Sequence, residues 1–312
     1  MGDTVVLVTG AAGFAGSHLL EHLAGSADLV GWSRSDPPPQ LAPLAQWQRV
    51  DILNSGQVDG ALELMRPRAI FHCAGLPHVA ESWNDTAAAL AANVLGTHRI
   101  LDAVDRLGYR CRILVTGSAQ VYAAANEPIT EDGAIDPSSP YALSKLAQEQ
   151  LALRSGTEQM EVIVARPFNH TGPRQKPSFL APGVARQIAL IERGELEPVI
   201  KVGNLDPRRD LIDVRDAVRA YAALMNHGAP GTVYNVASGI PRPVRAIVEA
   251  LVARARVPIR IEQDPSRFRP NDVPVLVGNA GRLKDATGWR PEIPFERMIS
   301  DLLDFWRKTA TA

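Results

Sequence analysis

Two side chains suited to proton transfer, Tyr141 and Lys145, stand four residues apart in a segment expected to be helical. At this spacing both side chains lie on one face of the helix. A phenol has an unperturbed pKa of about 10, so proton transfer at neutral pH requires about 4 kcal/mol of added stability for the phenolate. A neighbouring ammonium supplies part of it. Ser118 follows an earlier apolar run, and its hydroxyl is suited to hold the oxygen that gains or loses the proton.

A glycine-rich loop near the N-terminus predicts a second chemistry. Residues 9–16 read TGAAGFAG, between an apolar run and a helical segment. The first glycine permits a positive φ angle, the second lets backbone N–H groups approach a pyrophosphate, and the third packs the helix against the strand. The helix N-terminus adds positive potential. A structural turn is the weaker alternative, and we expect dinucleotide contacts from Gly10, Gly13, Phe14, Ala15 and Gly16.

The end of the second apolar run indicates which nicotinamide cofactor fits. Sites that prefer NAD present an Asp or Glu to the ribose hydroxyls, whereas this chain offers Ser33 and Arg34. An arginine suits a 2′-phosphate, so NADP(H) is preferred and NAD(H) is possible. The alternatives are that Asp36 takes the acidic role or that Arg34 is only solvated. Asp51 and Ile52 are expected on the adenine side, although an Asp at a strand end is often a cap.

The elements that must position these residues follow an alternating pattern. Ala/Leu-rich helical stretches, the first expected over 17–24, separate short apolar runs at 4–8, 29–32, 69–72, 113–116 and 162–165. Alternation of this kind predicts an α/β fold, a doubly wound parallel sheet of the Rossmann type. Both cysteines, Cys73 and Cys111, adjoin apolar runs and are expected to be reduced core or strand-end residues.

The amino-acid composition changes after Arg166, where four prolines occur within 16 residues. We expect a dinucleotide-binding core over residues 1–166 and a smaller, interleaved substrate-binding region over 167–312. Segments near 211–237, including a strand at 233–236, are expected to return to the core. Two helices are expected over 183–192 and 244–256.

Composition excludes several classes of protein. The 312 residues carry 33 basic and 34 acidic side chains, a net charge of −1, which argues against nucleic acid as a partner. No run approaches the roughly 18 to 20 apolar residues needed to cross a membrane. The N-terminal segment lacks the basic region of a secretory signal, so we expect the cytoplasm. His18 and His22 have a possible zinc spacing but no third ligand nearby, so no metal is expected.

The order of glycine loop, Ser118, Tyr141 and Lys145 resembles the extended branch of the short-chain dehydrogenase/reductase superfamily, which acts on nucleotide sugars. The segments at 165–175, 202–221, 233–239 and 264–274 narrow the resemblance to GDP-6-deoxy-D-mannose reductases and, more distantly, GDP-mannose 4,6-dehydratases. The resemblance implies hydride transfer from NADPH to C4 of GDP-4-keto-6-deoxy-D-mannose, giving GDP-D-rhamnose. It also implies a homodimer formed through helices at 90–107 and 141–153.

The same resemblance assigns further contacts. Lys145 would also bond the nicotinamide ribose, and Ala74 and Pro167 would line the cofactor. For a GDP-linked ketosugar, Arg209 and Arg269 are the candidate diphosphate ligands, since a neutral protein needs a local set of donors, and surface ion pairs are the alternative. Asn169 resembles a pyrophosphate-contacting asparagine or else forms a turn. The remaining substrate candidates are Ser82 near the sugar and Asp272 near the nucleoside ribose.

The residues after Ser118 favour reduction over elimination. Removing water across C5 and C6 needs an acid and a base besides the tyrosine. The two positions directly after Ser118 hold Ala119 and Gln120, and neither side chain can serve as that acid or base. A 4,6-dehydratase is therefore disfavoured. A nucleotide-sugar 4-epimerase needs no extra carboxylate and stays the alternative, although it usually accompanies NAD-type binding. A non-catalytic cofactor-sensing protein is a remote alternative, because all three catalytic residue types are present.

Overall fold

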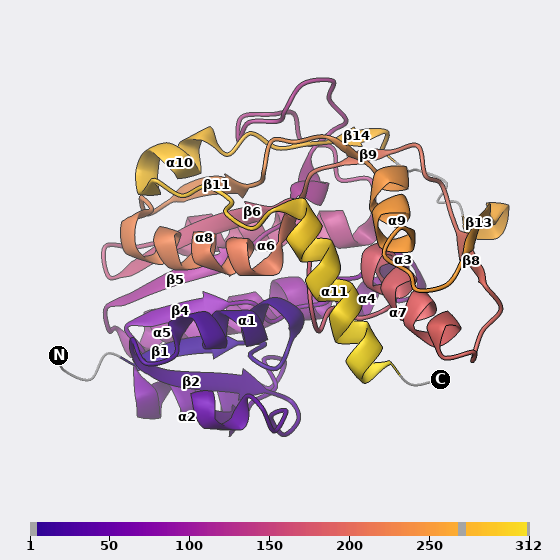
Figure 1. The fold of residues 1–312 in the computed structure, drawn as a ribbon. Coiled ribbons are helices and arrows are strands. Elements are labelled where there is room, and N and C mark those ends of the chain that lie inside the picture. The colour runs from indigo at the N-terminus through magenta and orange to yellow at the C-terminus, as the bar shows by residue number, and fades with distance from the viewer. Residues whose placement is uncertain (1–4, 268–272, 311–312) are drawn as a thin grey trace.

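A computed structural model describes residues 5–267 and 273–310. Its centre is a parallel sheet with the strand order β11-β6-β5-β4-β1-β2-β3 (Figure 1). Apart from the added β11, this is the 3-2-1-4-5-6 order of a Rossmann fold, so the predicted fold class is confirmed. The strands are β1 (Val5–Thr9), β2 (Asp28–Ser33), β3 (Gln46–Arg49), β4 (Ala69–His72), β5 (Cys111–Thr116), β6 (Met160–Pro167) and β11 (Thr232–Val236).

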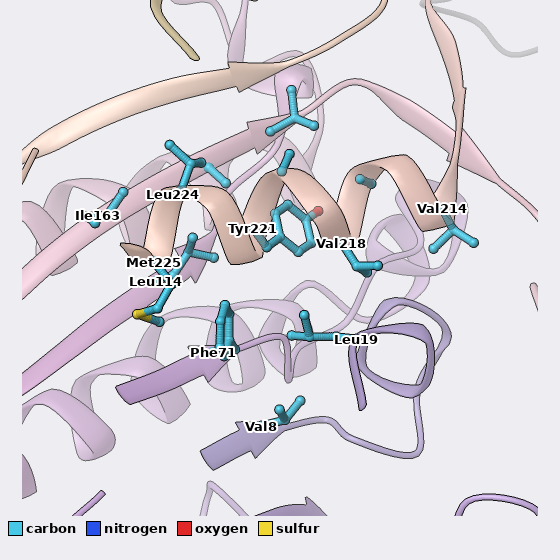
Figure 2. Packing of buried hydrophobic residues seen from close by; sticks show 14 of the residues in the cluster. Val8, Leu19, Phe71, Leu114, Ile163, Val214, Val218, Tyr221, Leu224 and Met225 are labelled. Carbon is cyan, nitrogen blue, oxygen red and sulfur yellow. The ribbon is translucent and has the colours of Figure 1, made fainter. Parts of the chain in front are cut away.

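Helices cover both faces of the sheet because each strand buries side chains on both sides. Val6 and Val8 belong to one hydrophobic cluster and Leu7 to the other, following the two-residue period of a strand. The first face is covered by α1 (Phe14–Leu23), α8 (Val214–His227) and α10 (Gly281–Thr287); the second is covered by α2 (Ser55–Met65), α5 (Gly96–Leu107) and α6 (Pro140–Ser155). Figure 2 shows Tyr221 of α8 directed toward Leu19 and Phe71 on the first face.

A second group of elements gathers beyond the carboxyl ends of the strands. Its hydrophobic cluster is formed mainly by α7 (Leu180–Glu192), α9 (Val244–Val252) and α11 (Phe295–Thr309), the last shown yellow in Figure 1. Three small sheets accompany them: β7 (Asn169–Thr171) with β10 (Leu211–Asp213), β8 (Val199–Val202) with β13 (Arg260–Gln263), and β9 (Arg208–Arg209) with β12 (Arg242–Pro243) and β14 (Val275–Leu276). Between these elements the chain returns once to the central sheet, where β11 pairs with β6.

Short elements complete the described chain. The segment between β4 and α5 folds as α3 (Val79–Asn84), α4 (Thr86–Leu90) and a π-helical turn, η2 (Ala91–Leu95). The 3-10 turns are η1 (Ala42–Leu44), η3 (Ala119–Val121) and η4 (Pro265–Arg267). Across residues 5–267 and 273–310, no helix has the length and apolar character of a membrane span.

Three helix boundaries differ from the sequence-based expectations. α1 begins at Phe14 rather than three residues later, because Gly13 already takes the extended N-cap conformation. α7 begins at Leu180 and accommodates Pro182 in its first turn, where no helical N–H is lost. α9 ends at Val252, four residues before the expected end, since the chain turns at Ala253.

Candidate active site

The glycine loop between β1 and α1 brings backbone unusually close to backbone. Gly10 has a φ of +66°, and a Cβ there would lie 2.8 Å from Ala74 N. A Cβ on Gly16 would lie 2.3 Å from Gly10 O, so this residue closes the strand against the helix. Gly13 caps α1 without a side-chain hydrogen bond, and the first turn of α1 carries no acidic residue. The loop therefore leaves the N-terminal N–H groups of α1 available to a pyrophosphate.

The end of β2 lies against this loop, because Ala11 N donates to Trp32 O at 3.1 Å. Ser33 ends the strand, and its Oγ accepts from Ser35 N at 3.2 Å. Arg34 is exposed and makes no hydrogen bond or ion pair with another of the described residues. Its guanidinium is therefore free of protein contacts within the described residues, and a contact with the adenosine ribose remains a proposal.

Asp51 and Ile52 follow β3 on the neighbouring side. One carboxylate oxygen of Asp51 accepts from Leu53 N at 2.9 Å, so the side chain does cap a turn. Ile52 packs closely on the start of α5: a Cβ on Gly96 would lie 2.5 Å from Ile52 Cδ1. Both residues sit at the carboxyl end of the strand beside β2, and a cofactor contact for them remains a proposal.

The three residues expected to move a proton are gathered at the carboxyl ends of β5 and β6. Ser118 precedes η3, and both Tyr141 and Lys145 are buried on the first turns of α6. Burial raises the pKa of Tyr141, and a hydrogen bond with Ser118 partly opposes the rise. Burial lowers the pKa of Lys145 to about 8. At neutral pH the phenol is therefore protonated and the amine is mostly an ammonium.

The start of α6 is fixed by two serines. Ser139 accepts from Ala142 N at 3.1 Å as the N-cap, with Pro140 in the first helical position, where its missing N–H costs nothing. Ser82 Oγ accepts from Tyr141 N at 3.0 Å and donates to Val79 O at 2.7 Å. Ser82 is not among the residues that line the adjoining cavity. Its hydroxyl positions the backbone of Tyr141, and a contact with the sugar remains a prediction.

A cavity of about 510 Å³ opens between the Rossmann core and α7. Its wall includes Ser118, Tyr141 and Gln120 on one side and residues of α7, β8 and α9 on the other. Among the described residues that line it there is no aspartate or glutamate, while Lys201 and Arg209 contribute positive charge. The cavity is therefore suited to an anionic ligand whose reacting end lies beside the tyrosine.

The substrate candidates occupy different places in this wall. Pro167, Asn169 and Arg209 all line the cavity. Asn169 Nδ2 is buried and has no hydrogen-bond partner within the described part of the chain, which is unusual unless a ligand supplies the acceptor. Arg209 Nη1 donates to Val273 O at 2.7 Å, so part of its guanidinium is engaged by the protein. Arg269 and Asp272 lie outside the described residues.

Two histidines, His78 and His170, also line the cavity. His78 Nε2 lies 2.5 Å from Ser178 Oγ and its ring contacts Phe179, which links the loop after β4 to the entrance of α7. The sequence analysis missed this pair, because its members are 100 residues apart and only the fold joins them. His170 stacks on Phe14 at 5.7 Å, and its Nδ1 lies 3.2 Å from Phe168 O.

The structure also places His18 and both cysteines, which the sequence analysis considered apart from the catalytic residues. No cluster of three His, Cys, Asp or Glu side chains able to hold a metal ion occurs within 5–267 and 273–310. His18 Nε2 instead lies 2.9 Å from Pro173 O. Cys73 and Cys111 are free thiols.

Comparison with known proteins adds three findings. The model of the family described as GDP-mannose 4,6 dehydratase matches residues 7–302. GDP-6-deoxy-D-mannose reductase from Pseudomonas aeruginosa is 39% identical over 305 residues, covering 96% of each protein, and UDP-glucose 4-epimerase from Mycolicibacterium smegmatis is 28% identical over 96% of this chain and 98% of its own. The structure of RMD from Pseudomonas aeruginosa complexed with NADPH has a TM-score of 0.86 at 37% identity, covering 98% of this chain and 99% of the other.

Proposed function

The chain belongs to the GDP-mannose 4,6 dehydratase family, and we propose that it uses NADPH to reduce the C4 keto group of GDP-4-keto-6-deoxy-D-mannose to GDP-D-rhamnose. It is an NAD(P)-dependent oxidoreductase of the extended short-chain dehydrogenase/reductase type. The relative that is 39% identical carries the corresponding reductase name. The residues of the site should therefore be suited to reduction of a ketone, whereas the family takes its name from an elimination of water.

The observation that carries the proposal is the absence of a carboxylate from the described cavity wall. Elimination of water from the sugar needs a base near C5 and an acid near C6 in addition to the tyrosine. Ala119 and Gln120 follow Ser118 in the wall, and neither side chain takes up a proton near neutral pH. Carbonyl reduction needs one proton donor, which this wall contains in Tyr141, and a hydride, which NADPH would supply when bound.

The chain's own residues provide the proton and hold the oxygen. Ser118 Oγ holds the keto oxygen, and the Tyr141 hydroxyl donates its proton to that oxygen as it becomes a hydroxyl. Burial raises the pKa of Tyr141, so the phenol enters the reaction protonated. The Lys145 ammonium, one turn along α6, then stabilises the phenolate until the proton is replaced from solvent.

The residues around the glycine loop fit a bound NADP(H). Gly10, Gly13 and Gly16 admit the pyrophosphate, and Arg34 is placed for a 2′-phosphate. The cofactor supplies the hydride when it is bound. The structure of RMD complexed with NADPH supports this preference, and NAD(H) is a possible second cofactor.

The nucleoside diphosphate fits the positive end of the cavity. Asn169 Nδ2 offers a donor that has no hydrogen-bond partner among the described residues, and Arg209 adds a guanidinium. We assign Arg269 and Asp272 to the same ligand on resemblance alone. Ser82 positions the backbone of Tyr141, and we keep it as a candidate contact of the sugar on resemblance.

A GDP-selective oxidation assay tests this function. Purified enzyme should oxidise NADPH in proportion to GDP-4-keto-6-deoxy-D-mannose added, and much more slowly with NADH or with the thymidine-linked ketosugar. A nucleotide-sugar 4-epimerase would instead retain bound NAD after purification and convert its substrate with no net use of cofactor. That result would replace the reductase assignment.

We also propose that the enzyme is a homodimer that works in the cytoplasm. Leu90 and Leu95 are 38% and 42% exposed at the two ends of the π turn, and Leu143 of the adjoining α6 is 51% exposed. A second copy would cover this apolar surface. Light scattering after size exclusion should give twice the chain mass of 33.7 kDa, and a single-chain mass would contradict the dimer.

A further inference from the structure

A run of buried polar groups starts at the Lys145 ammonium and passes first through Gln148. Lys145 Nζ donates to Gln148 Oε1 at 2.7 Å and to Thr116 O at 2.7 Å. Gln148 lies three residues further along α6 and is fully buried. Its Nε2 donates in turn to Thr97 Oγ1 at 2.7 Å. The amide therefore contacts the ammonium at one end and is anchored to α5 at the other.

Thr97 fixes the orientation of this amide. Its single hydroxyl proton goes to Asn93 O at 2.7 Å, in the π turn before α5. The oxygen then accepts from Gln148 Nε2 and from His72 Nε2, which lies 2.8 Å away. An amide turned the other way would place its NH₂ against the ammonium and its oxygen against an oxygen with no proton to give. Gln148 thus presents its oxygen to Lys145.

The same chain of hydrogen bonds continues to the cofactor loop. Because His72 donates from Nε2, its Nδ1 accepts from Thr9 Oγ1 at 2.8 Å. Thr9 Oγ1 accepts from Ala74 N at 3.2 Å, beside Gly10. Burial and the nearby charge of Lys145 lower the pKa of His72 to about 3, so the imidazole stays neutral as this pattern requires.

We propose that Gln148 is a positioning residue that keeps the Lys145 ammonium charged and in place beside Tyr141. The amide dipole stabilises the ammonium more than the neutral amine, because the positive charge strengthens the hydrogen bond to the partly negative amide oxygen. With two protons held by Gln148 and Thr116, one remains for the cofactor ribose. The catalytic meaning of this role rests on the proposed function, but the effect on the charge of Lys145 does not.

The other groups around Lys145 leave Gln148 in this role. His72 and Cys73 face it from β4, and burial raises the pKa of Cys73 to about 12, so both are uncharged at neutral pH. α5 and the π turn contribute Thr97 and Asn93, and β5 contributes the Thr116 carbonyl, none of which titrates. Tyr141 lies one turn earlier on α6. Glu149, the next residue, is committed to Arg166 of β6 at 2.5 Å.

The low lysine content makes a direct test practical. Only five of the 33 basic residues are lysine, so a protein labelled with ¹³C at the lysine ε-carbon gives five signals. Lys145 is identified by its loss in Lys145→Arg. Its pKa is then read from a pH titration of wild type, Gln148→Glu, Gln148→Met and the matched control Gln159→Glu. Gln159 is exposed in the loop before β6, at the amino end of that strand, whereas the catalytic residues lie at its carboxyl end.

Opposite shifts are expected in the two Gln148 variants. A carboxylate at 148 should raise the pKa of Lys145 by about one or more, and the thioether should lower it by about one, while Gln159→Glu leaves it unchanged. The alkaline limb of log kcat/KM should move in the same directions, because the pKa of Lys145 lies below that of Tyr141. A merely structural role would lower kcat in both variants without opposite shifts.

Each outcome is decisive. If the ε-carbon signal titrates alike in wild type and both Gln148 variants, the proposal is overturned. Should Gln148→Met fail to fold, a Gln148→Glu titration without an upward shift overturns it equally. If the signal shifts as expected but wild type oxidises no NADPH with the ketosugar, the reductase assignment fails while the role of Gln148 in holding the ammonium stands.

Discussion

A tyrosine that donates a proton must start protonated, and the lysine that stabilises the resulting phenolate must be charged, although both are buried on one helix. Burial raises the pKa of Tyr141, which suits an acid, and lowers the pKa of Lys145 to about 8, which leaves an ammonium at neutral pH. Activity should therefore be lost as the pH rises through the pKa of Lys145. The alkaline limb reports that ammonium, since the phenol titrates at higher pH.

Replacing the proton donor should separate chemistry from binding. Tyr141→Phe removes the phenol hydroxyl, and we expect kcat to fall by about 10²- to 10⁴-fold or more. Binding of NADPH, followed by fluorescence, should remain within a few-fold of wild type because the glycine loop is untouched. Turnover close to wild type would exclude Tyr141 as the acid.

Cofactor selectivity should depend on a single guanidinium. Arg34→Ala removes the charge placed for a 2′-phosphate, and a lost charge-assisted hydrogen bond of about 1.5–3 kcal/mol corresponds to a rise of about 10- to 100-fold in KM for NADPH. KM for NADH should change little, because NADH lacks that phosphate. Equal effects on both cofactors would show that Arg34 does not read the 2′ position.

At the scale of elements, a buried ion pair joins the catalytic helix to the sheet. Arg166 of β6 donates to both carboxylate oxygens of Glu149 on α6, at 2.7 and 2.5 Å, and its Nη1 donates to Tyr122 Oη at 2.7 Å. Tyr122 follows the turn that carries Ser118. The pair therefore holds α6, β6 and the serine turn in one arrangement.

Breaking this pair should cost far more than replacing it. Arg166→Met leaves a buried carboxylate without its partner, and we expect the free energy of unfolding to fall by about 3–5 kcal/mol. The double variant Glu149→Leu/Arg166→Met should recover part of the loss, because no charge is then buried. Urea denaturation measures both values. A double variant less stable than Arg166→Met would show that the polar contacts, rather than the unpaired charge, dominate.

The strands, the glycine loop and the Ser118–Tyr141–Lys145 set were predictable because local patterns specify them. Short apolar runs, almost continuously buried, mark most strands of the central sheet, and the three glycines lie where backbone approaches backbone. The π turn at Ala91–Leu95 was not predictable, since the stretch reads as one continuous helix. His78 and Gln148 were missed, and the contact of Ser82 with the Tyr141 backbone was not foreseen, because these partners are fixed only by packing between distant elements.

At the scale of the whole molecule, the chain after β7 is fastened to α1, the helix that follows the glycine loop. Arg174, in the loop after β7, has a φ of +72° and donates to both carboxylate oxygens of Glu21 on α1, at 2.8 and 2.6 Å. Burial raises the pKa of Glu21, but hydrogen bonds from His18 and Arg174 outweigh it and lower the pKa to about 2. The Arg174–Glu21 ion pair thus joins the loop after β7 to α1, next to the glycine loop.

This tie should weaken in acid. The lowered pKa means that the pair stabilises the fold fully above the ordinary value of 4.5, and that this stability is lost as the pH falls toward about 2. Arg174→Met should therefore lower the Tm most at neutral pH, and the difference from wild type should shrink below pH 4.5. Arg260→Met, which breaks an exposed pair with Glu262, is the control and should change the Tm little. A difference that stays constant with pH would contradict the assignment.

Hydride delivery from NADPH to C4 of the GDP-linked ketosugar is tested most directly by labelling the hydride with deuterium. The enzyme is given NADPH deuterated at the transferable position together with GDP-4-keto-6-deoxy-D-mannose, and the product is examined by NMR. We predict one deuterium at C4 of GDP-D-rhamnose for each NADPH oxidised. GDP-D-rhamnose that carries no deuterium at C4, or deuterated NADPH left unoxidised beside unchanged ketosugar, would contradict hydride delivery from NADPH to C4.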